Sequence, residues 1–354
     1  SNLIRIMPAE EDMLRHIFKI FLFSILVSIG FSGCSKKAEN SARQNEVVVY
    51  TYDSFCGEWG PGAAIAKKFT EKTGLKVTYV DCGDGVEILS RAALEKGNVQ
   101  ADVILGLDNN LAKKAAEQDI LEAYKPAGSE AVSEELKKAL GSKNLLTPFD
   151  YAPFAIVFDT KANVPAPKSL DDLTKPVYAK KIILMNPRTS TPGLGFAAWT
   201  CAVKGEKVLD YWKALKPNIL TMAPGWSAGY GLFTNGEAPL VCSYTTSAAY
   251  HYEYDKTDRY QALIFDDGHI LQVEGAGLAK NAPNKKGAQS FLDFLISEDA
   301  QNELPLTQWM LPANKNVKLP QSYIDGTPSP KKLLSYDTEK ANASIEQIMA
   351  VLGE

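Results

Sequence analysis

The sequence has few of the residues that build metal and redox sites. Its 354 residues include only five cysteines and three histidines. It contains no Cys-x-x-Cys pair and no histidine-rich spacing of the kind that binds zinc. The nucleotide-binding pattern GxxxxGK[ST] is also missing. These absences argue against a zinc protein and a P-loop nucleotide hydrolase, and we expect neither a metal site nor a bound cofactor.

The sequence also has no large excess of positive or negative charge. The chain has 38 lysines and arginines against 42 aspartates and glutamates, a net charge of −4, and no block of five or six like charges. A nucleic-acid surface needs clustered positive charge, so we expect no nucleic-acid partner. With 45% hydrophobic and 23% charged residues, the composition is that of a globular protein with enough material for two domains.

An apolar run near the N-terminus, residues 20–31, is about a dozen residues long, short of the roughly 20 that a membrane-spanning helix needs. Arg15 and Lys19 precede it, which makes the region similar to a secretory signal. The Ser-Gly-Cys sequence that ends at Cys34 resembles a bacterial lipobox, in which the cysteine is lipidated. We therefore predict an exported protein that is lipid-anchored through Cys34; a plain signal peptide or a short anchor helix is the alternative.

The signal region is taken as residues 1–34, of which 1–12 precede Met13 and are interpreted as an N-terminal extension. Residues 35–45 are polar and aperiodic, so we expect a flexible tether there. An exported protein enters an oxidising compartment. Apart from Cys34, four cysteines remain, and the sequence alone does not choose among their three possible pairings.

Strand and helix patterns alternate along the rest of the chain with short links between them. This alternation is typical of parallel βαβ units and predicts an α/β fold. A chain of this length is better divided into two lobes than built on one core. The expected strands are 46–52, 75–80, 101–106, 155–160, 181–185, 239–244 and 269–279, and the expected helices are 62–74, 84–97, 109–118, 193–205, 205–215, 245–254, 285–296 and 337–352.

Polar and aromatic clusters follow five of the expected strands. Ligands of such sheets bind beyond the carboxyl ends of the strands, so we expect these clusters to face one cleft between the lobes. The clusters are 50–59, 81–85, 107–110, 186–195 and 243–250.

One of these clusters, RTSTPGLG, has the pattern of an anion site. Ser190 and Thr191 precede Pro192, which suits the first turn of a helix. Free N–H groups and a partial positive charge meet at a helix start, and two hydroxyls lie beside them. The cluster therefore predicts either a phosphate seat or a simple helix cap.

Aromatic residues are frequent in the same clusters. Residues 49–62, VYTYDSFCGEWGPG, could use their rings for the core or as a stacking platform, and Cys56 could be a nucleophile, half of a disulfide or neither. Aromatic faces attract cations by roughly 0.5–2 kcal/mol each, and an acid such as Asp84 could balance the charge or cap its helix. We expect a flat, cationic ligand that could carry phosphate.

At these residues the sequence resembles the thiamine-binding substrate-binding proteins of ABC importers. The matching stretches extend in order from about residue 47 to residue 312, and RTSTPGLG with SYTTS is specific to that family. The resemblance implies the type II periplasmic-binding-protein fold, in which two α/β lobes close over the ligand. It divides the chain into a first lobe of 46–152 plus 277–354 and a second lobe of 153–276. The stretches are VYTYDSF, WGPG, DGV, ADVILGLDNNL, PFDY, NPRTSTPGLG, GWSAGYGLF, SYTTSAAYH, GHILQVE and WMLP.

The resemblance also implies roles for single residues. Asp84 and Gly85 would contact the aminopyrimidine side of thiamine, and Ser190 and Thr191 would hold the phosphate end of thiamine phosphates. Aromatic and hydroxyl side chains would pack on the rings or hydrogen-bond near them. These are Trp226, Tyr244, Thr245, Thr246 and Ser247, with Tyr52, Trp59, Tyr250 and Trp309 as further walls. The implied protein is a monomeric receptor that delivers thiamine to an inner-membrane ABC permease.

Cys56 and Cys82 depart from the family motif and flank site loops of the first lobe, so we expect a disulfide between them, with Cys201 and Cys242 as buried thiols. Two other functions remain open. A thiaminase I-like enzyme would use Cys56 as nucleophile with Glu274 or Asp84 as base. A receptor of the same fold could instead bind ferric iron or a polyamine.

Overall fold

The computed structural model describes residues 43–353. The expected signal sequence, the lipid-bearing Cys34 and nearly all of the tether lie outside these residues. In the part that is described, none of the helices is both long and apolar enough to cross a membrane.

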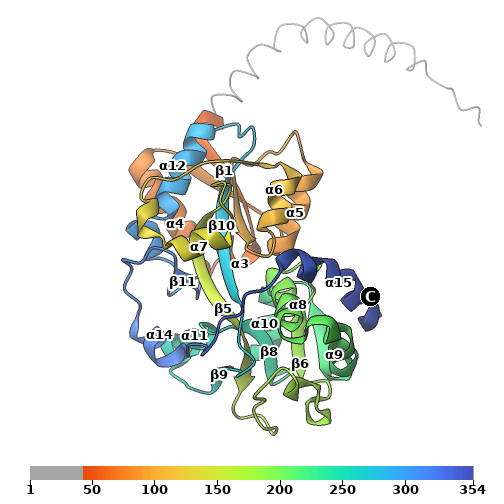
Figure 1. Ribbon diagram of the computed structural model, residues 1–354. Helices are drawn as coiled ribbons and strands as arrows, with labels where there is room; N and C mark the ends of the chain where they lie inside the picture. The colour runs from red at the N-terminus through yellow and green to blue at the C-terminus, as the bar shows by residue number, and fades with distance from the viewer. Residues whose placement is uncertain (1–42, 354) are drawn as a thin grey trace, which may run out of the picture. The chain divides into compact units, whose positions relative to one another are not determined.

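The first lobe is built on a sheet in which three parallel strands are joined by an antiparallel one. β1 pairs with β2 and β3, and β10 runs antiparallel to β3 and β5. The strands are β1 (Glu46–Thr51), β2 (Lys76–Asp81), β3 (Val103–Asp108), β4 (Leu121–Glu122), β10 (Leu271–Ala279), β11 (Leu311–Pro312) and the first half of β5 (Thr147–Asp159). The helices are α3 (Asp53–Cys56), α4 (Gly62–Thr73), α5 (Gly85–Leu94), α6 (Ala112–Gln118), α7 (Glu134–Ala139), α12 (Lys285–Leu295) and α13 (Glu298–Gln301), with a 3-10 turn η1 (Ser129–Ala131). Figure 1 shows α4 and α12 on one side of β1 and β10, and α5 and α6 on the other.

The second lobe repeats the layered arrangement around a smaller sheet. β6 pairs in parallel with β7 and β8, and β8 and β9 run antiparallel to the second half of β5. The strands are β6 (Ile182–Met185), β7 (Ile219–Ala223), β8 (Leu240–Tyr244) and β9 (Tyr260–Leu263). The helical elements are α8 (Thr191–Lys204), α9 (Val208–Leu215), α10 (Trp226–Thr234), α11 (Ser247–Tyr250) and the π-helix η6 (His251–Asp255), with 3-10 turns η2 (Asp172–Thr174), η3 (Pro176–Tyr178), η4 (Gly205–Lys207) and η5 (Lys216–Asn218).

The long strand β5 belongs to both sheets. Its residues 147–153 pair with β10, and Phe154–Phe158 pair with β8. The chain therefore crosses from the first sheet to the second near residue 153. The return crossing lies earlier than expected: β10 pairs with β5 from Leu271 onward, so residues 271–276 belong to the first sheet and not to the second lobe.

The C-terminal region corrects the expected division as well. We expected residues 277–354 in the first lobe, but α14 (Gln321–Gly326) packs against α11, and α15 (Thr338–Leu352) packs against α8 and α9 (Figure 1). The reason is that α15 buries an apolar face, which includes Ile345, Ile348 and Met349, on the second lobe. Tyr336 and Asn342 also hydrogen-bond to Asn110 of the first lobe, so the C-terminal segment spans both lobes.

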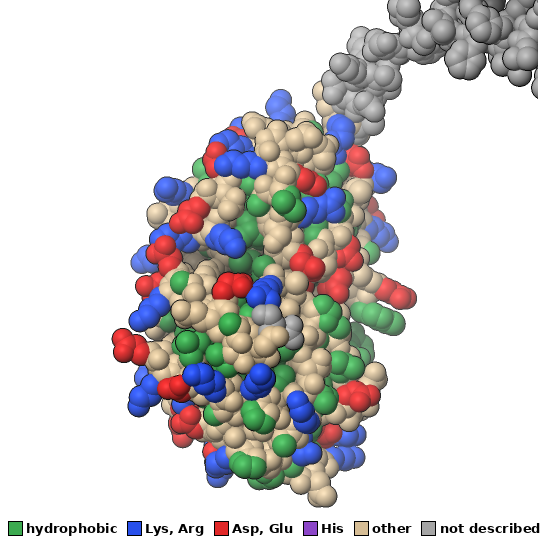
Figure 2. Space-filling model, turned by 90° about the vertical axis from the view of Figure 1, so that its right-hand side faces the viewer, with side chains coloured by type: hydrophobic (Ala, Val, Ile, Leu, Met, Phe, Trp, Pro, Cys, Tyr) green, Lys and Arg blue, Asp and Glu red, His purple; other side chains and the backbone are tan. Residues whose placement is uncertain are grey.

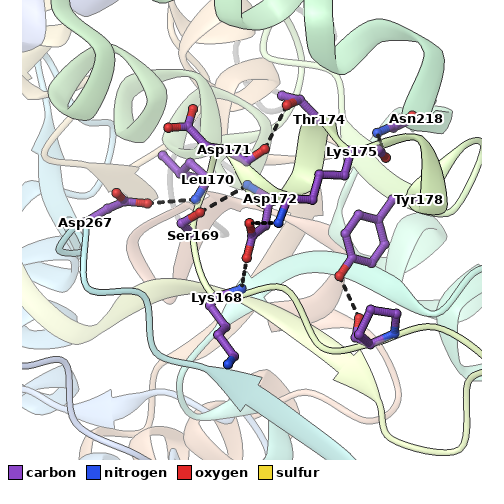
Figure 3. A network of polar contacts seen from close by, with 11 residues as sticks. Lys168, Ser169, Leu170, Asp171, Asp172, Thr174, Lys175, Tyr178, Asn218 and Asp267 are labelled. Carbon is purple, nitrogen blue, oxygen red and sulfur yellow. Dashed lines mark hydrogen bonds and ion pairs between the residues drawn. The ribbon is translucent and has the colours of Figure 1, made fainter.

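The segment between β5 and β6 is held by its own polar groups (Figure 3). Leu170 N donates to Asp267 Oδ2 at 2.7 Å, and Lys168 N donates to Asp172 Oδ2 at 2.8 Å. The Tyr178 hydroxyl donates to the carbonyl oxygen of Pro165 at 2.6 Å. Because these groups bond within the second lobe, they hold the segment against that lobe.

Candidate ligand-binding site between the lobes

Asp84 connects the two lobes at the starts of three helices. It is the N-cap of α5, where its Oδ1 accepts a hydrogen bond from Gly85 N at 2.6 Å. Its Oδ2 accepts from Trp226 N, the first residue of α10, at 2.9 Å. The Ser190 hydroxyl, at the N-cap of α8, also hydrogen-bonds to this carboxylate. A carboxylate at converging helix starts meets free N–H donors and favourable dipoles.

The environment of Asp84 changes its acidity. Only 7% of the residue is exposed. Burial raises the pKa of this carboxyl from 3.8 to about 6, the hydrogen bonds from Gly85, Trp226 and Ser190 lower it, and the charge of Asp53 raises it. The group is therefore ionised at neutral pH and keeps its bond to the second lobe.

Two glycines allow this close approach of the lobes. A Cβ on Gly85 would overlap the side chain of Thr191, and a Cβ on Gly225 would lie 2.9 Å from Asp84 Oδ2. The contact therefore requires glycine on both sides: Gly85 in the DGV stretch and Gly225 in the GWSAGYGLF stretch.

Two aromatic rings of the second lobe lie beside this contact. Trp226 stacks on Tyr230 with ring centroids 5.0 Å apart, and its Nε1 donates to Ser243 Oγ at 2.9 Å. Tyr244 stacks on Phe154 at 5.1 Å, and its hydroxyl donates to Gln272 Oε1 at 3.0 Å. Ring positions fixed by stacking and a hydrogen bond are preorganised for a flat ligand.

Behind Tyr244 lies a group of buried carboxyls. Asp150 and Glu274 are directly opposite each other on the antiparallel strands β5 and β10. The Tyr52 hydroxyl donates to Glu274 Oε2 at 3.2 Å. Gln308 Nε2 donates to Asp150 Oδ2 at 2.9 Å and lies 3.4 Å from Glu274 Oε2. Both carboxyls are buried, and burial raises the pKa of Asp150 to about 6 and the pKa of Glu274 well above its usual range.

Asp108, at the end of β3, adds a third buried carboxyl. Its Oδ1 accepts from Asn110 N at 3.0 Å and from Leu111 N at 3.1 Å. Burial and the charge of Glu274 raise its pKa to about 7. The charges of Glu274, Asp84 and Asp108 all raise the pKa of Tyr244, which places this ring among the three carboxyls.

The hydroxyls expected at 245–247 are bonded within the protein. The Thr246 hydroxyl donates to the carbonyl oxygen of Trp309, and Ser247 Oγ lies 2.6 Å from Ser243 Oγ. Thr245 is buried, and its backbone N donates to the carbonyl oxygen of Pro153 at 3.0 Å. These residues fix the end of β8 and the start of α11, where they support Trp226 and Tyr244.

The other aromatic residues that were expected to line the ligand lie in two places. Trp309 meets Tyr250 edge-on at 5.3 Å and stacks on Tyr323 at 6.2 Å, so Tyr250 and Trp309 form one cluster at the lobe border. Trp59 is 84% exposed in the loop before α4 and is not packed into the group around Asp84.

Sequence reasoning did not name Asp150 or Gln308 as site residues, included Asp108 only as part of the cluster 107–110, and named Glu274 only as a possible base. One signal was present: Gln272 and Glu274 are polar at alternate positions of an otherwise apolar strand, so both point to the same face. Asp150 and Gln308 carry no such signal, since each is recognised only by its spatial neighbours.

The expected disulfide between Cys56 and Cys82 is not formed in the structure, where both are free thiols, as are Cys201 and Cys242. Cys56 Sγ lies 3.4 Å from the carbonyl oxygen of Tyr52, and Cys82 Sγ lies 3.5 Å from that of Val80. Each thiol is thus directed to a backbone oxygen of its own segment. Burial and the charge of Asp81 raise the pKa of Cys56 to about 11, the reverse of what a nucleophile needs.

Other features of the described residues limit the chemistry. Within residues 43–353, no group of three histidine, cysteine, aspartate or glutamate side chains is arranged to hold a metal ion. Figure 2 shows basic and acidic side chains interspersed over one face of the molecule. That face has no broad patch of one sign.

Comparison with known proteins agrees with this architecture. The family described as bacterial extracellular solute-binding protein matches residues 98–342. A thiamine-binding periplasmic protein of Brucella abortus is 37% identical over 90% of this chain and 92% of its own length. A protein of the same name from Salmonella typhimurium is 41% identical over 78% of this chain and 83% of its own length.

Solved structures give the same result. A periplasmic thiamin-binding protein superposes with a TM-score of 0.80 at 37% identity and covers 87% of this chain and 96% of its own. A ferric binding protein from Campylobacter jejuni superposes at 0.71 with only 19% identity, so it supports the fold alone. The expected two-lobed type II fold is confirmed. The chain belongs to the bacterial extracellular solute-binding proteins and, within them, to the family of the thiamine-binding periplasmic proteins.

Proposed function

We propose that this protein is the extracytoplasmic receptor that binds thiamine for an ABC importer. The observation that carries the proposal is the meeting of aromatic rings with buried carboxyls where the two lobes join. Trp226 and Tyr244 offer stacking faces, and Asp84, Asp150 and Glu274 offer negative charge. Thiamine is a flat molecule with a permanent positive charge, which such a site attracts. Relatives of the same name support the assignment.

We infer from the contacts of Asp84 which residues would hold which end of the ligand. Asp84 is bonded to Ser190 and Trp226, so it lies with the anion seat instead of apart from it. We therefore infer that Asp84, Ser190 and Thr191 face the hydroxyethyl or phosphate end. The aminopyrimidine end would then lie toward Tyr52 and Glu274. Trp226 and Tyr244 would pack between the two ends.

The cellular setting is part of the proposal. Lipidation at Cys34 would anchor the protein to the membrane on its extracytoplasmic side, and residues 35–45 would serve as the tether. The receptor would act as a monomer and pass its ligand to the permease of the importer. No cofactor is needed, because capture and release involve no bond chemistry; the two lobes close and open around the ligand.

The alternative functions find less support. A thiaminase I-like reaction needs an activated thiolate, whereas the thiol of Cys56 has a raised pKa and lies against a backbone carbonyl. Ferric iron requires a set of anionic ligands, and among residues 43–353 no three histidine, cysteine, aspartate or glutamate side chains are grouped to hold a metal ion. A polyamine would leave the stacked rings without a flat partner.

Calorimetry with thiamine, its monophosphate and its diphosphate tests the proposal. We expect binding of at least thiamine, and failure to bind any of the three would refute it. Ser190→Ala then tests the phosphate seat. We expect a loss of about five- to tenfold for the phosphorylated forms, corresponding to about 1 kcal/mol for one hydrogen bond, with a smaller loss for thiamine. Equal losses for all three forms would contradict that assignment.

A further inference from the structure

The carboxyls Asp150 and Glu274 pose a problem of charge in the absence of ligand. Asp150 is 0% exposed and Glu274 is 4% exposed, and they face each other across a pair of antiparallel strands. Two carboxylates in this position repel each other at short range, and neither is hydrated enough to weaken that repulsion. Such a pair remains stable only if something positive lies between or beside them.

The described protein supplies no cation for this purpose. The hydrogen-bond donors to the pair are neutral: the Tyr52 hydroxyl and the Gln308 amide. The charges that act most strongly on Glu274 come from Asp150 and Asp84, and no lysine or arginine in the described residues is among them. Asp150 Oδ1 is buried and meets no N–H or hydroxyl donor.

The two carboxyls are brought together by one amide, since Gln308 Nε2 lies 2.9 Å from Asp150 Oδ2 and 3.4 Å from Glu274 Oε2, and they lie opposite each other on paired strands. Two ionised carboxylates this close could only repel, because both are acceptors, whereas one proton held between them would join them by a hydrogen bond. A shared proton gives Asp150 Oδ1 the partner it otherwise lacks. The free site is therefore an acid pair that holds one proton at neutral pH.

A cationic ligand would meet the same need as that proton. The pair lies behind Tyr52 and Tyr244, next to the rings that are expected to stack on the ligand, and it is coupled by charge to Asp84 at the lobe contact. Once the positively charged ring of the ligand is enclosed on Tyr244, in front of the pair, both carboxylates can be ionised, and the proton leaves to solvent.

We propose that Asp150 and Glu274 recognise the positive charge of the ligand. The cationic ligand takes the place of one proton that the two carboxyls share, and this proton is released to solvent on binding. This inference rests on the proposed function, since it takes thiamine as the cation. It adds a specificity determinant: a neutral molecule of the same shape would leave the shared proton in place, so it would release no proton and gain no attraction from the charge of the pair. No other bond is made or broken, and the balance is one cation bound for one proton released.

Several other groups could titrate on binding, and the experiment must separate them from the pair. The groups that face it are Tyr52, Asp84, Asp108, Tyr244 and Tyr323. The tyrosines have raised pKa values because they are buried, so they stay protonated at neutral pH. Asp84 and Asp108 are the carboxyls that could contribute a proton of their own.

The test is calorimetry of thiamine binding to the full-length protein at neutral pH in phosphate and in Tris, two buffers that differ in ionisation enthalpy. Wild type should release about one proton per thiamine, and its affinity should rise by up to tenfold per pH unit between about pH 6 and about pH 8. Thiamine binding without proton release would overturn the inference while leaving the proposed function intact. Absence of binding would instead refute the proposed function.

Two near-isosteric variants locate the proton. Glu274→Gln and Asp150→Asn each replace a carboxyl with an amide that donates to the remaining carboxylate, so the shared proton is no longer needed. In either variant, proton release should fall toward zero and the pH dependence of affinity should flatten. Asp84→Asn removes the carboxyl at the lobe contact; its thiamine affinity should fall, but the number of protons released per bound thiamine should stay near one. If the release disappears in Asp84→Asn and persists in both pair variants, the proton comes from Asp84 and the inference is wrong. If one pair variant fails to fold, the other still locates the proton, because each variant removes one of the two carboxyls that share it.

Discussion

The two lobes contribute different chemistry to the site. The first lobe supplies the negative charge, from Asp84, Asp108, Asp150 and Glu274. The second lobe supplies neutral donors and stacked rings, including Ser190, Trp226 and Tyr244. A cation would therefore be attracted mainly to the first lobe, and closure of the second lobe would add ring faces and remove water. The division also explains why Asp84 matters: it is the carboxylate that the second lobe's helix starts contact directly.

The largest effect should come from blocking that contact. Gly85→Ala places a methyl group against Thr191, so α5 and α8 can no longer approach. Overpacking costs about 1–3 kcal/mol, and we expect a loss of thiamine affinity of up to about 100-fold with little change in thermal stability of the free protein. Calorimetry and thermal unfolding measure the two quantities.

Gly231→Ala is the matched control for Gly85→Ala. Gly231 also lies in a helix of the site region, α10, but a Cβ there meets nothing within 4 Å. Its affinity should stay close to that of wild type. Equal losses in the two variants would show that the approach of the lobes does not limit binding.

A smaller effect should follow from removing a ring of the second lobe. Trp226→Ala deletes the face that Tyr230 supports, and we expect a loss of about 1.5 kcal/mol, or roughly tenfold, for every form of the ligand. Trp59→Ala removes an exposed ring of the first lobe and should cost less. Titration by tryptophan fluorescence or calorimetry compares the thiamine affinities of the two variants. A greater loss in Trp59→Ala would contradict the division of labour between the lobes.

The smallest effect concerns pH and the stability of the free protein. In the first lobe, the pKa of Asp108 is raised to about 7 and that of Glu274 well above its usual range, so the folded chain holds protons that the unfolded chain has released. Their contribution to the free energy of unfolding therefore falls as pH rises. In the second lobe, burial lowers the pKa of His251 and of the border residue His269, which makes their contribution fall as pH drops below about 6.5.

Between about pH 7 and about pH 8 the histidines stay mainly neutral in both states, and the carboxyls determine the trend. We expect the free energy of unfolding to fall by about 1 kcal/mol across this range, and Glu274→Gln to reduce the fall. Denaturant unfolding at the two ends of this pH range measures the change in the free energy of unfolding. A rise in stability over the same range would show that the carboxyl pair is not protonated in the free protein.

Some elements could be predicted because their signals are local. Asp84 starts α5 with a capping box completed by Glu87, and Ser190 starts α8, as their positions before apolar helices indicate. Others could not be predicted. Residues 147–153 contain two prolines and do not read as a strand, yet they pair with β10 and β11. The helix expected at 245–254 is short α11 followed by the π-helix η6, in which His251 Nδ1 bonds to Asp255.

The sequence by itself determined the alternating α/β elements, the family and the residue types of the site, because periodicity, caps and motifs depend on near neighbours in the chain. Only the tertiary structure decided that Asp84 bonds to the start of α10, that Asp150 faces Glu274, and that Cys56 and Cys82 are free thiols. It also moved α15 to the second lobe. These facts depend on strand register and on packing between segments that are far apart in the sequence. The residues involved are buried together and stabilise the fold jointly, but no local sequence pattern links them.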